Sequence, residues 1–292
     1  VNVDEFLGHV AALAAELPDA PYAINLCSNR YLFLVSFCAC LTRTQTNLLP
    51  PNASDGTLQS IRERYPDSYL LHDGCLQNPD ILGRSARLDL NQIRLGSRAT
   101  SDIPQIALAH LAAVVFTSGS TGQPKAVEKS WNTLVTSTHI NAQQMLADID
   151  TPHQALATVP GQHMWGLETS VLMPLVHPLS VSDARPFYPL DICKALESLC
   201  APRLLITTPV HLRSLLLSKL ALPPVQKILC ATAPLGSGLA EAAEQAFSGH
   251  LLEIYGCSEA GSMAIRSTAQ SKQWQLFPQL HLDHDVDQSH GE

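Results

Sequence analysis

One stretch constrains this chain more than any other: an apolar run that ends abruptly in a loop of small residues. Leu111 to Phe116 predicts a buried strand, and the six residues from Thr117 to Gly122 are only Gly, Ser or Thr. The glycines let the main chain approach a ligand, and clustered N–H groups and hydroxyls can surround an anion. Lys125 follows three positions later and supplies a mobile positive charge. The pattern predicts a polyphosphate site.

The loop differs from the P-loop of nucleotide-binding proteins, because that motif has Gly directly before its Lys and Pro124 stands here. Pro124 favours an extended chain, so we expect a second strand over Ala126–Lys129. Ser130 then suits the cap of a helix over about Trp131–Leu146. The alternative is a flexible surface loop. The apolar strand before it and the Pro-Lys pair after it favour the phosphate interpretation.

Composition excludes some classes of protein. The chain has 292 residues, of which 46% are hydrophobic, enough for a large core in one or two domains. Its net charge of −8, without a Lys/Arg cluster, disfavours nucleic acid as a partner. The longest near-apolar run, Tyr31–Thr42, is too short to span a bilayer, and the first residues do not resemble a signal peptide. Eight cysteines without a C-x-x-C pair favour reduced thiols in a cytoplasmic protein.

Strand-like and helix-like segments alternate along the chain, which predicts a largely parallel sheet with helical cover. A first helix is expected from Asp4, a candidate cap, to a stop at Pro18. Further on, Pro189 and Pro209 occupy positions typical of the first residue of a helix. The expected strands are 22–26, 46–49, 69–72, 111–116, 204–207, 227–230 and 251–255, and the expected helices between them include 29–41, 55–64, 210–217 and 239–247.

A second cluster of polar residues, Tyr255-Gly-Cys-Ser-Glu259, follows the strand at 251–255. Loops at the carboxyl ends of parallel strands are where ligands bind in α/β sheets. Tyr255 offers a flat face to an adenine, Ser258 can bond a phosphate oxygen, and Glu259 suits Mg²⁺. The alternative is an ordinary turn with one buried Tyr.

Both clusters resemble motifs of one family. Phe116-Thr-Ser-Gly-Ser-Thr-Gly-Gln-Pro-Lys125 is similar to the signature loop of the adenylate-forming (AMP-binding) superfamily. Its members include acyl-CoA synthetases, aryl-CoA ligases, peptide-synthetase adenylation domains and luciferases. The Tyr255 segment resembles the family's Y-G-x-T-E motif, with Ser258 in place of Thr. That replacement keeps the hydroxyl group.

Two further segments resemble the same family. Cys230-Ala-Thr-Ala-Pro-Leu235 is similar to a G-G-A-P-L turn that lines the adenine, although Ala231 and Thr232 replace its glycines. Pro160-Gly-Gln-His-Met-Trp-Gly166 is similar to a P-x-x-H-x-x-G segment whose His lies beside the acyl carboxylate. A His next to a Trp is otherwise more often a structural core residue.

The resemblance implies roles for these residues. Lys125, His163 and Glu259 would be catalytic, Glu259 would hold Mg²⁺, and His163, Trp165 and Gly166 would border the acyl group. The implied ATP- and phosphate-binding residues are Thr117, Ser118, Gly119, Ser120, Thr121, Gly122, Lys125, Ala233, Pro234, Tyr255, Gly256 and Ser258.

The implied fold class is α/β, the large N-terminal domain of the family, with two similar helix-flanked sheets that meet near the nucleotide. We expect a first subdomain over 1–150, a second over 151–265, and a truncated tail over 266–292 in which a β-barrel subdomain could begin. The implied reaction joins a small carboxylic acid to ATP, giving acyl-adenylate and pyrophosphate. Transfer to the thiol of CoA or an acyl carrier protein would follow.

Some features depart from the family and keep alternatives open. Ala126 stands where Gly is usual, and the family's ribose-binding Asp segment, hinge and C-terminal domain do not occur before Glu292. We therefore expect the isolated chain to be nearly inactive. A non-catalytic nucleotide-binding module or degenerate paralogue is the alternative.

A serine hydrolase is a more distant alternative. It would use Ser258, in Gly256-x-Ser-x-Ala260, together with Asp285 and His290. Residues 263–265 predict a strand after Ser258, whereas a nucleophile elbow needs a helix there.

Overall fold

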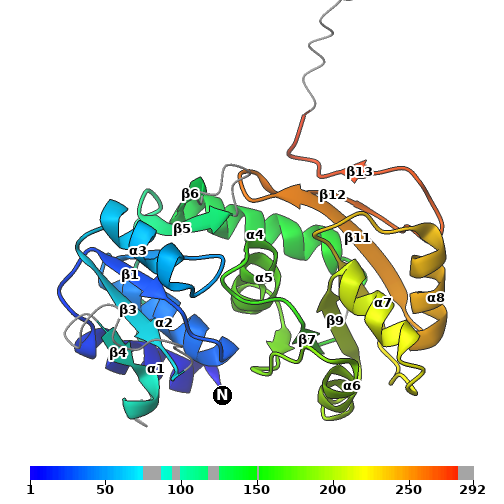
Figure 1. The fold of residues 1–292 in the computed structure, drawn as a ribbon, viewed down its shortest axis with the longest axis horizontal. Coiled ribbons are helices and arrows are strands. Elements are labelled where there is room, and N and C mark those ends of the chain that lie inside the picture. Colours follow the sequence, from blue (N-terminus) through cyan, green and yellow to red (C-terminus); the bar gives the residue numbers. More distant parts are fainter. Residues whose placement is uncertain (75–86, 94–98, 118–124, 150, 282–292) are drawn as a thin grey trace, which may run out of the picture.

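The computed structural model describes residues 1–74, 87–93, 99–117, 125–149 and 151–281. The chain forms two neighbouring α/β lobes, each built around one sheet (Figure 1). The expected α/β class with two helix-flanked sheets is therefore confirmed. Within the described ranges, no helix is both long and apolar enough to cross a membrane.

The first sheet has the strand order β4-β3-β1-β2-β5-β6. Its strands are parallel except β6, which runs antiparallel to β5. The bounds are β1 (Tyr22–Asn25), β2 (Thr46–Leu49), β3 (Ser68–His72), β4 (Arg87–Asp89), β5 (Leu111–Thr117) and β6 (Lys125–Ser130). Pairing of Thr117 with Lys125 places the two ends that flank residues 118–124 opposite each other. The strand expected after Pro124 is confirmed.

Helices cover both faces of this sheet. On one face, α1 (Val3–Glu16) and α2 (Arg30–Thr42) bury the large side chains Phe33 and Phe37 in a common core. On the other, α3 (Asp55–Arg64) packs Leu58 and Ile61 against the strands. The short η2 (Leu90–Gln92) follows β4 and buries Leu90 in the core shared with α1 and α2. The cap expected at Asp4 is wrong: the Asn2 side chain accepts the Glu5 N–H in a capping box, so the helix begins before Asp4.

The second sheet has the order β13-β12-β11-β10-β9-β7-β8. The run from β8 to β11 is parallel, and β12 and β13 are antiparallel additions. The bounds are β7 (His153–Ala157), β8 (Leu179–Val181), β9 (Arg203–Thr207), β10 (Lys227–Cys230), β11 (His250–Cys257), β12 (Gly261–Arg266) and β13 (Gln275–Leu276).

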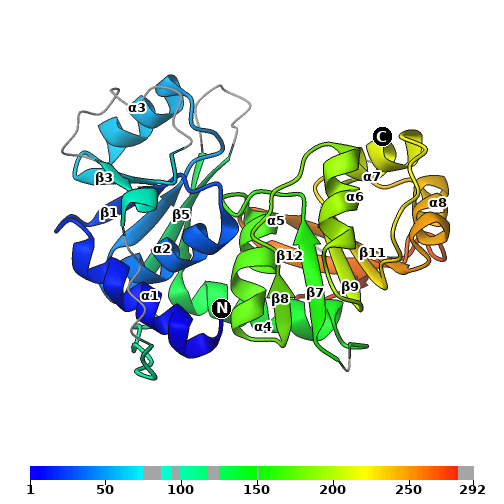
Figure 2. The ribbon, with the colours of Figure 1, turned by 90° about the horizontal axis from the view of Figure 1, so that it is seen from below.

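Three helices cover the outer face of the second sheet: α6 (Pro189–Glu197), α7 (Pro209–Leu217) and α8 (Ser237–Phe247). Figure 2 shows them together on one side of the strands. Helices α6 and α7 begin at their prolines, as expected, because the fixed φ of proline suits the first helical position.

The inner face of the second sheet packs against α4 (Trp131–Met145), which lies toward the first lobe (Figure 1). Ser130 caps α4 by accepting the Thr133 N–H, as expected. Helix α4 contributes Leu134 to the first core and Ala142 and Met145 to the second, so it spans the two lobes. The subdomain boundary near residue 150 stays a prediction, as does a β-barrel start after 266.

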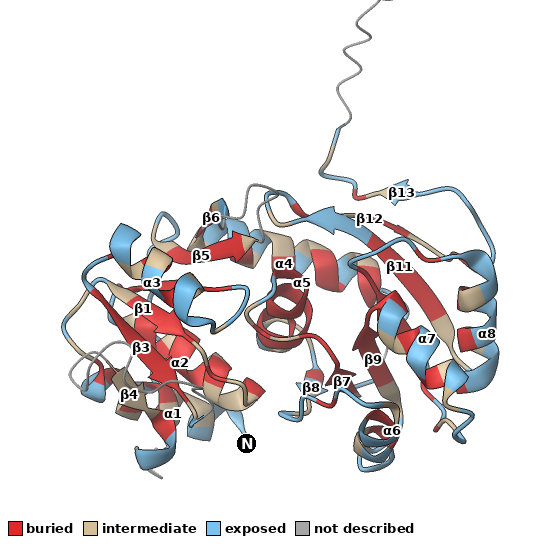
Figure 3. Cartoon of the chain, in the orientation of Figure 1, coloured by how far each residue is buried: buried red, intermediate tan, exposed pale blue. Residues whose placement is uncertain are grey.

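One helical segment belongs to both cores. It consists of α5 (Met164–Gly166), the π-helical turn η3 (Leu167–Leu172) and η4 (Met173–Leu175). Met164 and Leu167 pack in the first core, whereas Trp165 and Met173 pack in the second. Figure 3 shows this segment almost wholly buried between the lobes. Its N-terminus therefore has a fixed place at the lobe junction.

Candidate active site

Two residues of opposite charge meet across the junction. Lys125 starts β6 of the first sheet, and Glu259 lies in the turn between β11 and β12 of the second. Although 134 residues apart in sequence, Lys125 Nζ and Glu259 Oε1 lie 2.6 Å apart. Their hydrogen bond raises the pKa of Lys125 and lowers that of Glu259. Both side chains are largely exposed, so an incoming ligand can reach them.

A second lysine holds the turn that carries Glu259. Lys129 is only 2% exposed, and its Nζ donates a hydrogen bond to the Glu259 carbonyl oxygen at 2.7 Å. Burial lowers the pKa of Lys129. In the same turn, a Cβ on Gly256 would lie 2.4 Å from the Gly261 carbonyl oxygen, so only glycine fits there. The sequence patterns did not single out Lys129, which looks like one charge in an exposed strand.

The central part of the predicted phosphate loop lies outside the described residues. This applies to Ser118, Gly119, Ser120, Thr121 and Gly122. The structure places the two flanking residues, Thr117 and Lys125, side by side, and the Thr117 hydroxyl donates to the Lys125 carbonyl oxygen at 3.5 Å. The loop therefore starts and ends at the lobe junction.

Two pockets adjoin this junction. An inner pocket of about 200 Å³ lies in the second lobe and is lined by His163, Met164, Trp165, Glu168, Ala231, Thr232, Ile254, Gly256, Cys257, Ser258, Gly261 and Ser262. An outer pocket of about 510 Å³ includes Thr117 and Phe116 of the first lobe. His163, Met164 and Ser258 line both pockets, so the two spaces meet at these residues.

His163 lies where the two pockets meet. It precedes α5, and its Nδ1 accepts the Trp165 N–H at 3.3 Å, which leaves Nε2 to carry the proton of the neutral ring. Desolvation lowers the pKa of His163, so the ring is neutral at neutral pH. A neutral imidazole there can donate a hydrogen bond from Nε2 without adding charge.

Trp165 and Gly166 differ in what they contribute. Trp165 is buried, donates from Nε1 to the Thr207 carbonyl oxygen at 3.3 Å, and forms a wall of the inner pocket. Gly166 lies outside the described lining of both pockets. A Cβ on it would lie 2.0 Å from the Pro160 carbonyl oxygen, so the close approach of two backbone segments requires glycine.

Three candidate nucleotide residues do not line the inner pocket. Ala233, Pro234 and Tyr255 are exposed, and the structure places them outside the described lining of the inner pocket. The alternative of a buried Tyr is wrong, since Tyr255 is 57% exposed. Its ring centroid lies 5.6 Å from that of Trp274. Tyr255 thus offers its ring at the surface, whereas Gly256 and Ser258 face the inner pocket.

The turn at Ala233–Leu235 depends on a buried carboxylate that sequence patterns did not single out. Glu253 of β11 is 3% exposed, accepts the Leu235 N–H at 3.0 Å, and accepts Arg266 Nε at 2.7 Å. It also accepts the Thr268 hydroxyl. The sequence did carry a signal for this buried carboxylate, because Glu253 is a charged residue within the otherwise apolar run from Leu251 to Ile254.

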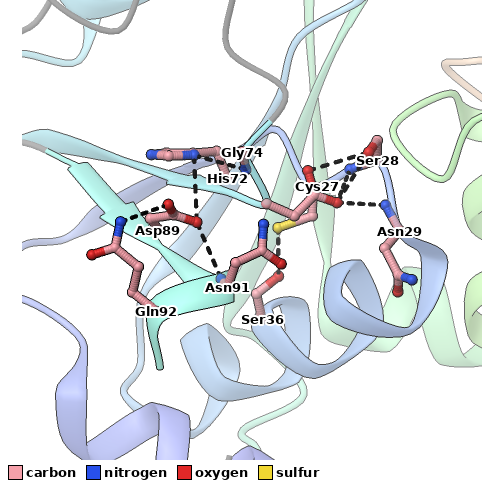
Figure 4. A network of polar contacts seen from close by, with 10 residues as sticks. Cys27, Ser28, Asn29, Ser36, His72, Gly74, Asp89, Asn91 and Gln92 are labelled. Carbon is pink, nitrogen blue, oxygen red and sulfur yellow. Dashed lines mark hydrogen bonds and ion pairs between the residues drawn. The ribbon is translucent and has the colours of Figure 1, made fainter. Parts of the chain in front are cut away.

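The wall of the outer pocket is fixed by hydrogen bonds at the start of α2 (Figure 4). One oxygen of Asp73, Oδ2, accepts the N–H groups of Ser28 at 2.7 Å and Asn29 at 2.6 Å. Asn29 in turn caps α2 by accepting the Leu32 N–H at 2.9 Å. The loop after β1 is therefore tied to the end of β3.

The site contains few candidate metal ligands. Within the described ranges, no three His, Cys, Asp or Glu side chains are grouped as a metal site would require. Glu259 is a charged, accessible hard-oxygen ligand, which suits Mg²⁺ bound mainly through phosphate oxygens and water.

The hydrolase alternative fails on geometry. Ser258 leads into the antiparallel strand β12, as its sequence predicted, whereas a nucleophile elbow leads into a helix. Asp285 and His290 lie outside the described residues.

The described cysteines are free in the structure, and the reduced state expected from the sequence stays a prediction. Burial is uneven, because Cys27, Cys40, Cys193 and Cys230 are buried whereas Cys200 and Cys257 are exposed. Cys257 lines the inner pocket and is therefore not a core residue.

Comparison with known protein families gives one match over most of the chain. The model described as AMP-binding enzyme matches residues 22–282. A 4-coumarate–CoA ligase from Rhodobacter capsulatus is 31% identical over 183 residues, 61% of this chain and 45% of that protein. A 3,4-dihydroxybenzoate–[aryl-carrier protein] ligase from Bacillus anthracis is 25% identical over 153 residues, 51% of this chain and 35% of that protein. The chain thus spans less than half the length of these relatives.

Solved structures share the fold at low sequence identity. A malonyl-CoA ligase complex with methylmalonyl-CoA and AMP has a TM-score of 0.74 at 21% identity, covering 89% of this chain and 56% of that one. An o-succinylbenzoate CoA synthetase from Bacillus subtilis, in complex with its acyl-adenylate intermediate, has a TM-score of 0.74 at 19% identity and covers 91% and 55%.

Proposed function

The chain belongs to the AMP-binding enzyme family, and from that premise we propose that the protein activates a carboxylic acid with ATP and passes the acyl group to a thiol. Two curated relatives support this, since one is named for ligation to CoA and the other for ligation to an aryl-carrier protein. The acceptor here is accordingly CoA or a carrier-protein thiol. A cytoplasmic location stays a prediction.

The observation that carries the proposal is the meeting of Lys125 and Glu259 beside the shared mouth of the two pockets. A cation from one lobe and an anion from the other lie next to the ends of a Gly/Ser/Thr loop. Such an arrangement suits a polyphosphate with its metal counter-ion. Lys125 can exchange its contact with Glu259 for phosphate oxygens, and Glu259 can exchange its contact with Lys125 for the metal.

In the first step, a carboxylate oxygen of the acid attacks the α-phosphorus of ATP. The new O–P bond forms as the bond from the α-phosphorus to the bridging oxygen breaks, and pyrophosphate leaves with the electron pair. A carboxylate is already ionised at neutral pH, so no protein base is needed. In the second step, a thiolate attacks the acyl carbon and AMP leaves.

This chain's residues would act mainly by placing charge. Lys125, released from Glu259, would neutralise phosphate oxygens together with Thr117 and the loop. Neutral His163 would border the acid's carboxylate and orient it from the mouth of the inner pocket. Glu259 would hold Mg²⁺, which supplies positive charge to the phosphates when bound. Ala233, Pro234 and Tyr255 would hold the base on the exposed face, and Gly256 and Ser258 would lie between the base and the acid.

A pyrophosphate-exchange assay on the full-length protein tests the proposal. Wild-type protein should incorporate labelled pyrophosphate into ATP in the presence of a suitable acid, whereas Lys125→Ala should lose most of this exchange. Lys194→Ala, an exposed helix lysine on α6, is the matched control and should behave as wild type.

Two results would oppose the proposal. Exchange that is unchanged in Lys125→Ala would remove the phosphate role of this residue. ATP binding without exchange across a panel of fatty, hydroxy and aryl acids would favour a non-catalytic nucleotide-binding protein.

A further inference from the structure

A carboxylate in the inner pocket has no role in the chemistry above. Glu168 belongs to η3, is 1% exposed, and lines the inner pocket together with Gly261 and Ser262 of β12. Turns of π-helix inside longer helices occur often at functional sites. This turn places an acidic side chain, otherwise rare in a core, beside the space assigned to the acyl group.

Only one of its two oxygens is satisfied. Glu168 Oε2 accepts the Ser262 hydroxyl at 3.0 Å, whereas Oε1 is buried and has no hydrogen-bond partner among the described residues. Burying a polar atom without a partner is unfavourable, and more so for a charged group. A ligand group that donates a hydrogen bond to Oε1 would remove this cost.

The backbone opposite is shaped around this oxygen. Gly261 has φ +77°, and a Cβ there would lie 2.5 Å from Glu168 Oε1. Glycine is therefore required both by the backbone conformation and by the space that Oε1 occupies. The Gly261 backbone thus packs directly against Oε1 and offers it no side-chain hydrogen-bond donor.

The surrounding groups leave the carboxyl available. Burial raises the pKa of Glu168, while the Ser262 hydroxyl, the Lys129 charge and the neighbouring Asn141 amide oppose that rise. Among the residues that the structure describes, Lys129 is the titratable group that acts on Glu168, and Lys129 Nζ is engaged with the Glu259 carbonyl oxygen. The amide atoms of Asn141 also have no hydrogen-bond partner within the described ranges. The Asn141 amide thus interacts with the carboxyl without meeting hydrogen-bond geometry, so a ligand donor would compete with this weak contact for Oε1.

We propose that Glu168 is a specificity-determining residue, which accepts a hydrogen bond from a hydroxyl or ammonium group on the acyl part of the acid. The inference rests on the proposed function and on the inner pocket as the acyl site. A purely alkyl acid of the same shape would leave Oε1 unpaired. Sites built to hydrogen-bond a substrate group reject analogues lacking that group far more strongly than they reject a missing methylene.

The test compares matched acids in pyrophosphate exchange by the full-length protein. The aliphatic set is 4-hydroxybutanoate, 4-aminobutanoate and pentanoate, and the aryl pair is 4-hydroxybenzoate and 4-methylbenzoate. Within the set that the protein uses, kcat/KM for the acid with a donor should exceed that for its methyl analogue by about 100-fold or more.

Variants at Glu168 then assign the preference. Glu168→Leu should bring the ratio between donor and methyl acids close to one, while exposed Glu241→Gln on α8 should keep the wild-type ratio. Glu168→Gln distinguishes the two donors, because an amide oxygen still accepts from a hydroxyl but does not balance an ammonium charge. A ratio within one variant does not depend on the fraction of protein that is folded, so partial instability does not obscure the result.

The outcomes separate this inference from the function on which it rests. Exchange with any acid, but with equal or greater kcat/KM for the methyl analogues, overturns the role of Glu168 alone. An unchanged ratio in both Glu168→Leu and Glu168→Gln does the same. Absence of exchange with every acid in wild-type protein overturns the proposed function, and the role of Glu168 with it.

Discussion

At the scale of single residues, the candidate site combines groups that sequence motifs mark with charges that they do not. Lys125 and Glu259 stand in motifs, and the structure brings their side chains together at 2.6 Å. Lys129 and Glu168 stand in no motif, and both are buried: Lys129 against the Glu259 turn and Glu168 in the wall of the inner pocket. The difference is physical, because a motif records contacts to a ligand, whereas burial depends on packing between segments distant in sequence.

The burial of Glu168 predicts a pH dependence of stability. The folded state raises the pKa of Glu168 above its usual 4.5, so between these two pKa values the folded protein binds more protons than the unfolded chain. The contribution of this group to the free energy of unfolding is therefore full below pH 4.5 and is lost as pH rises through the folded-state pKa. Glu168→Gln removes this dependence, because an amide stays neutral.

Urea unfolding at several pH values measures the effect. The stability of Glu168→Gln relative to wild type should increase from pH 4.5 toward neutral pH, while Glu241→Gln should run parallel to wild type. A difference between Glu168→Gln and wild type that is independent of pH would mean that Glu168 is not buried as described.

Glu259 predicts a separable effect on metal dependence. Glu259→Gln keeps the shape of the side chain but removes its charge, so a higher Mg²⁺ concentration should be needed for half-maximal pyrophosphate exchange. Thermal stability should change little, since the ion pair with Lys125 is solvent-exposed and such pairs contribute little to folding. A Mg²⁺ titration identical to that of wild type would count against Glu259 as the ligand.

At the scale of elements, local signals predicted much of the fold. Pro189 and Pro209 begin their helices, Ser130 caps α4, and the residues after Pro124 form β6. These outcomes follow from restrictions within a few residues, which the sequence carries directly.

Elements that depend on distant packing were not predicted. The π-helical turn η3 carries no local signal, because the lobes on either side determine it. The site shows the same limit. The glycines of the loop and the Tyr255 motif indicated it, but the burial of Glu168 and Lys129 requires α5, β6 and β12 to be in place.

The turn into α5 predicts a steric test. Gly166 has φ −70° and ψ −38°, which any residue adopts, so an alanine is opposed only by the 2.0 Å approach of its Cβ to the Pro160 carbonyl oxygen. Gly166→Ala should lower the free energy of unfolding by about 3 kcal/mol or more. The control is Gly238→Ala in α8, where nothing lies within 4 Å, and it should stabilise the helix by about 0.5–1 kcal/mol.

Chemical denaturation of both variants gives the comparison. If Gly166→Ala were as stable as wild type, Pro160 would not lie against α5, and the position of His163 between them would need revision. If the control Gly238→Ala were less stable than wild type, the surroundings of Gly238 would not be open as described.

At the scale of the whole molecule, the site exists only where two lobes join. Its parts come from the β5–β6 pair of one sheet, the β11–β12 turn of the other, and α5 between them. The family resemblance seen in the sequence predicted two sheets and a nucleotide near their junction. It did not predict which side chains fix the lobes against each other.

Arg30 is one such side chain. It lies in α2 of the first lobe, is 5% exposed, and donates from Nη2 to the carbonyl oxygens of Ala157 at 3.1 Å and Val159 at 2.9 Å. Its Nη1 donates to the Ser170 hydroxyl in η3. Burial lowers the pKa of Arg30 to about 10, so the guanidinium remains charged at neutral pH. One residue therefore satisfies three acceptors of the second lobe.

Replacing Arg30 by methionine should weaken the junction without refilling its hydrogen bonds. Methionine keeps an unbranched side chain, but the Ala157 and Val159 carbonyls and the Ser170 hydroxyl lose their shared donor. We expect a loss of about 2–4 kcal/mol in the free energy of unfolding. Arg43→Met, just after the same helix, is the control, because its contact to exposed Asp19 is 3.8 Å long and should contribute less than about 1 kcal/mol.

Thermal unfolding followed by calorimetry distinguishes loss at the junction from general destabilisation. Because Arg30 couples the lobes, Arg30→Met should broaden the unfolding transition or divide it in two. Pyrophosphate exchange should also fall, because Lys125 of the first lobe and Glu259 of the second would no longer be held at a fixed distance. A single sharp transition at the wild-type temperature, with full exchange activity, would show that α5 and η3 hold the lobes together without Arg30.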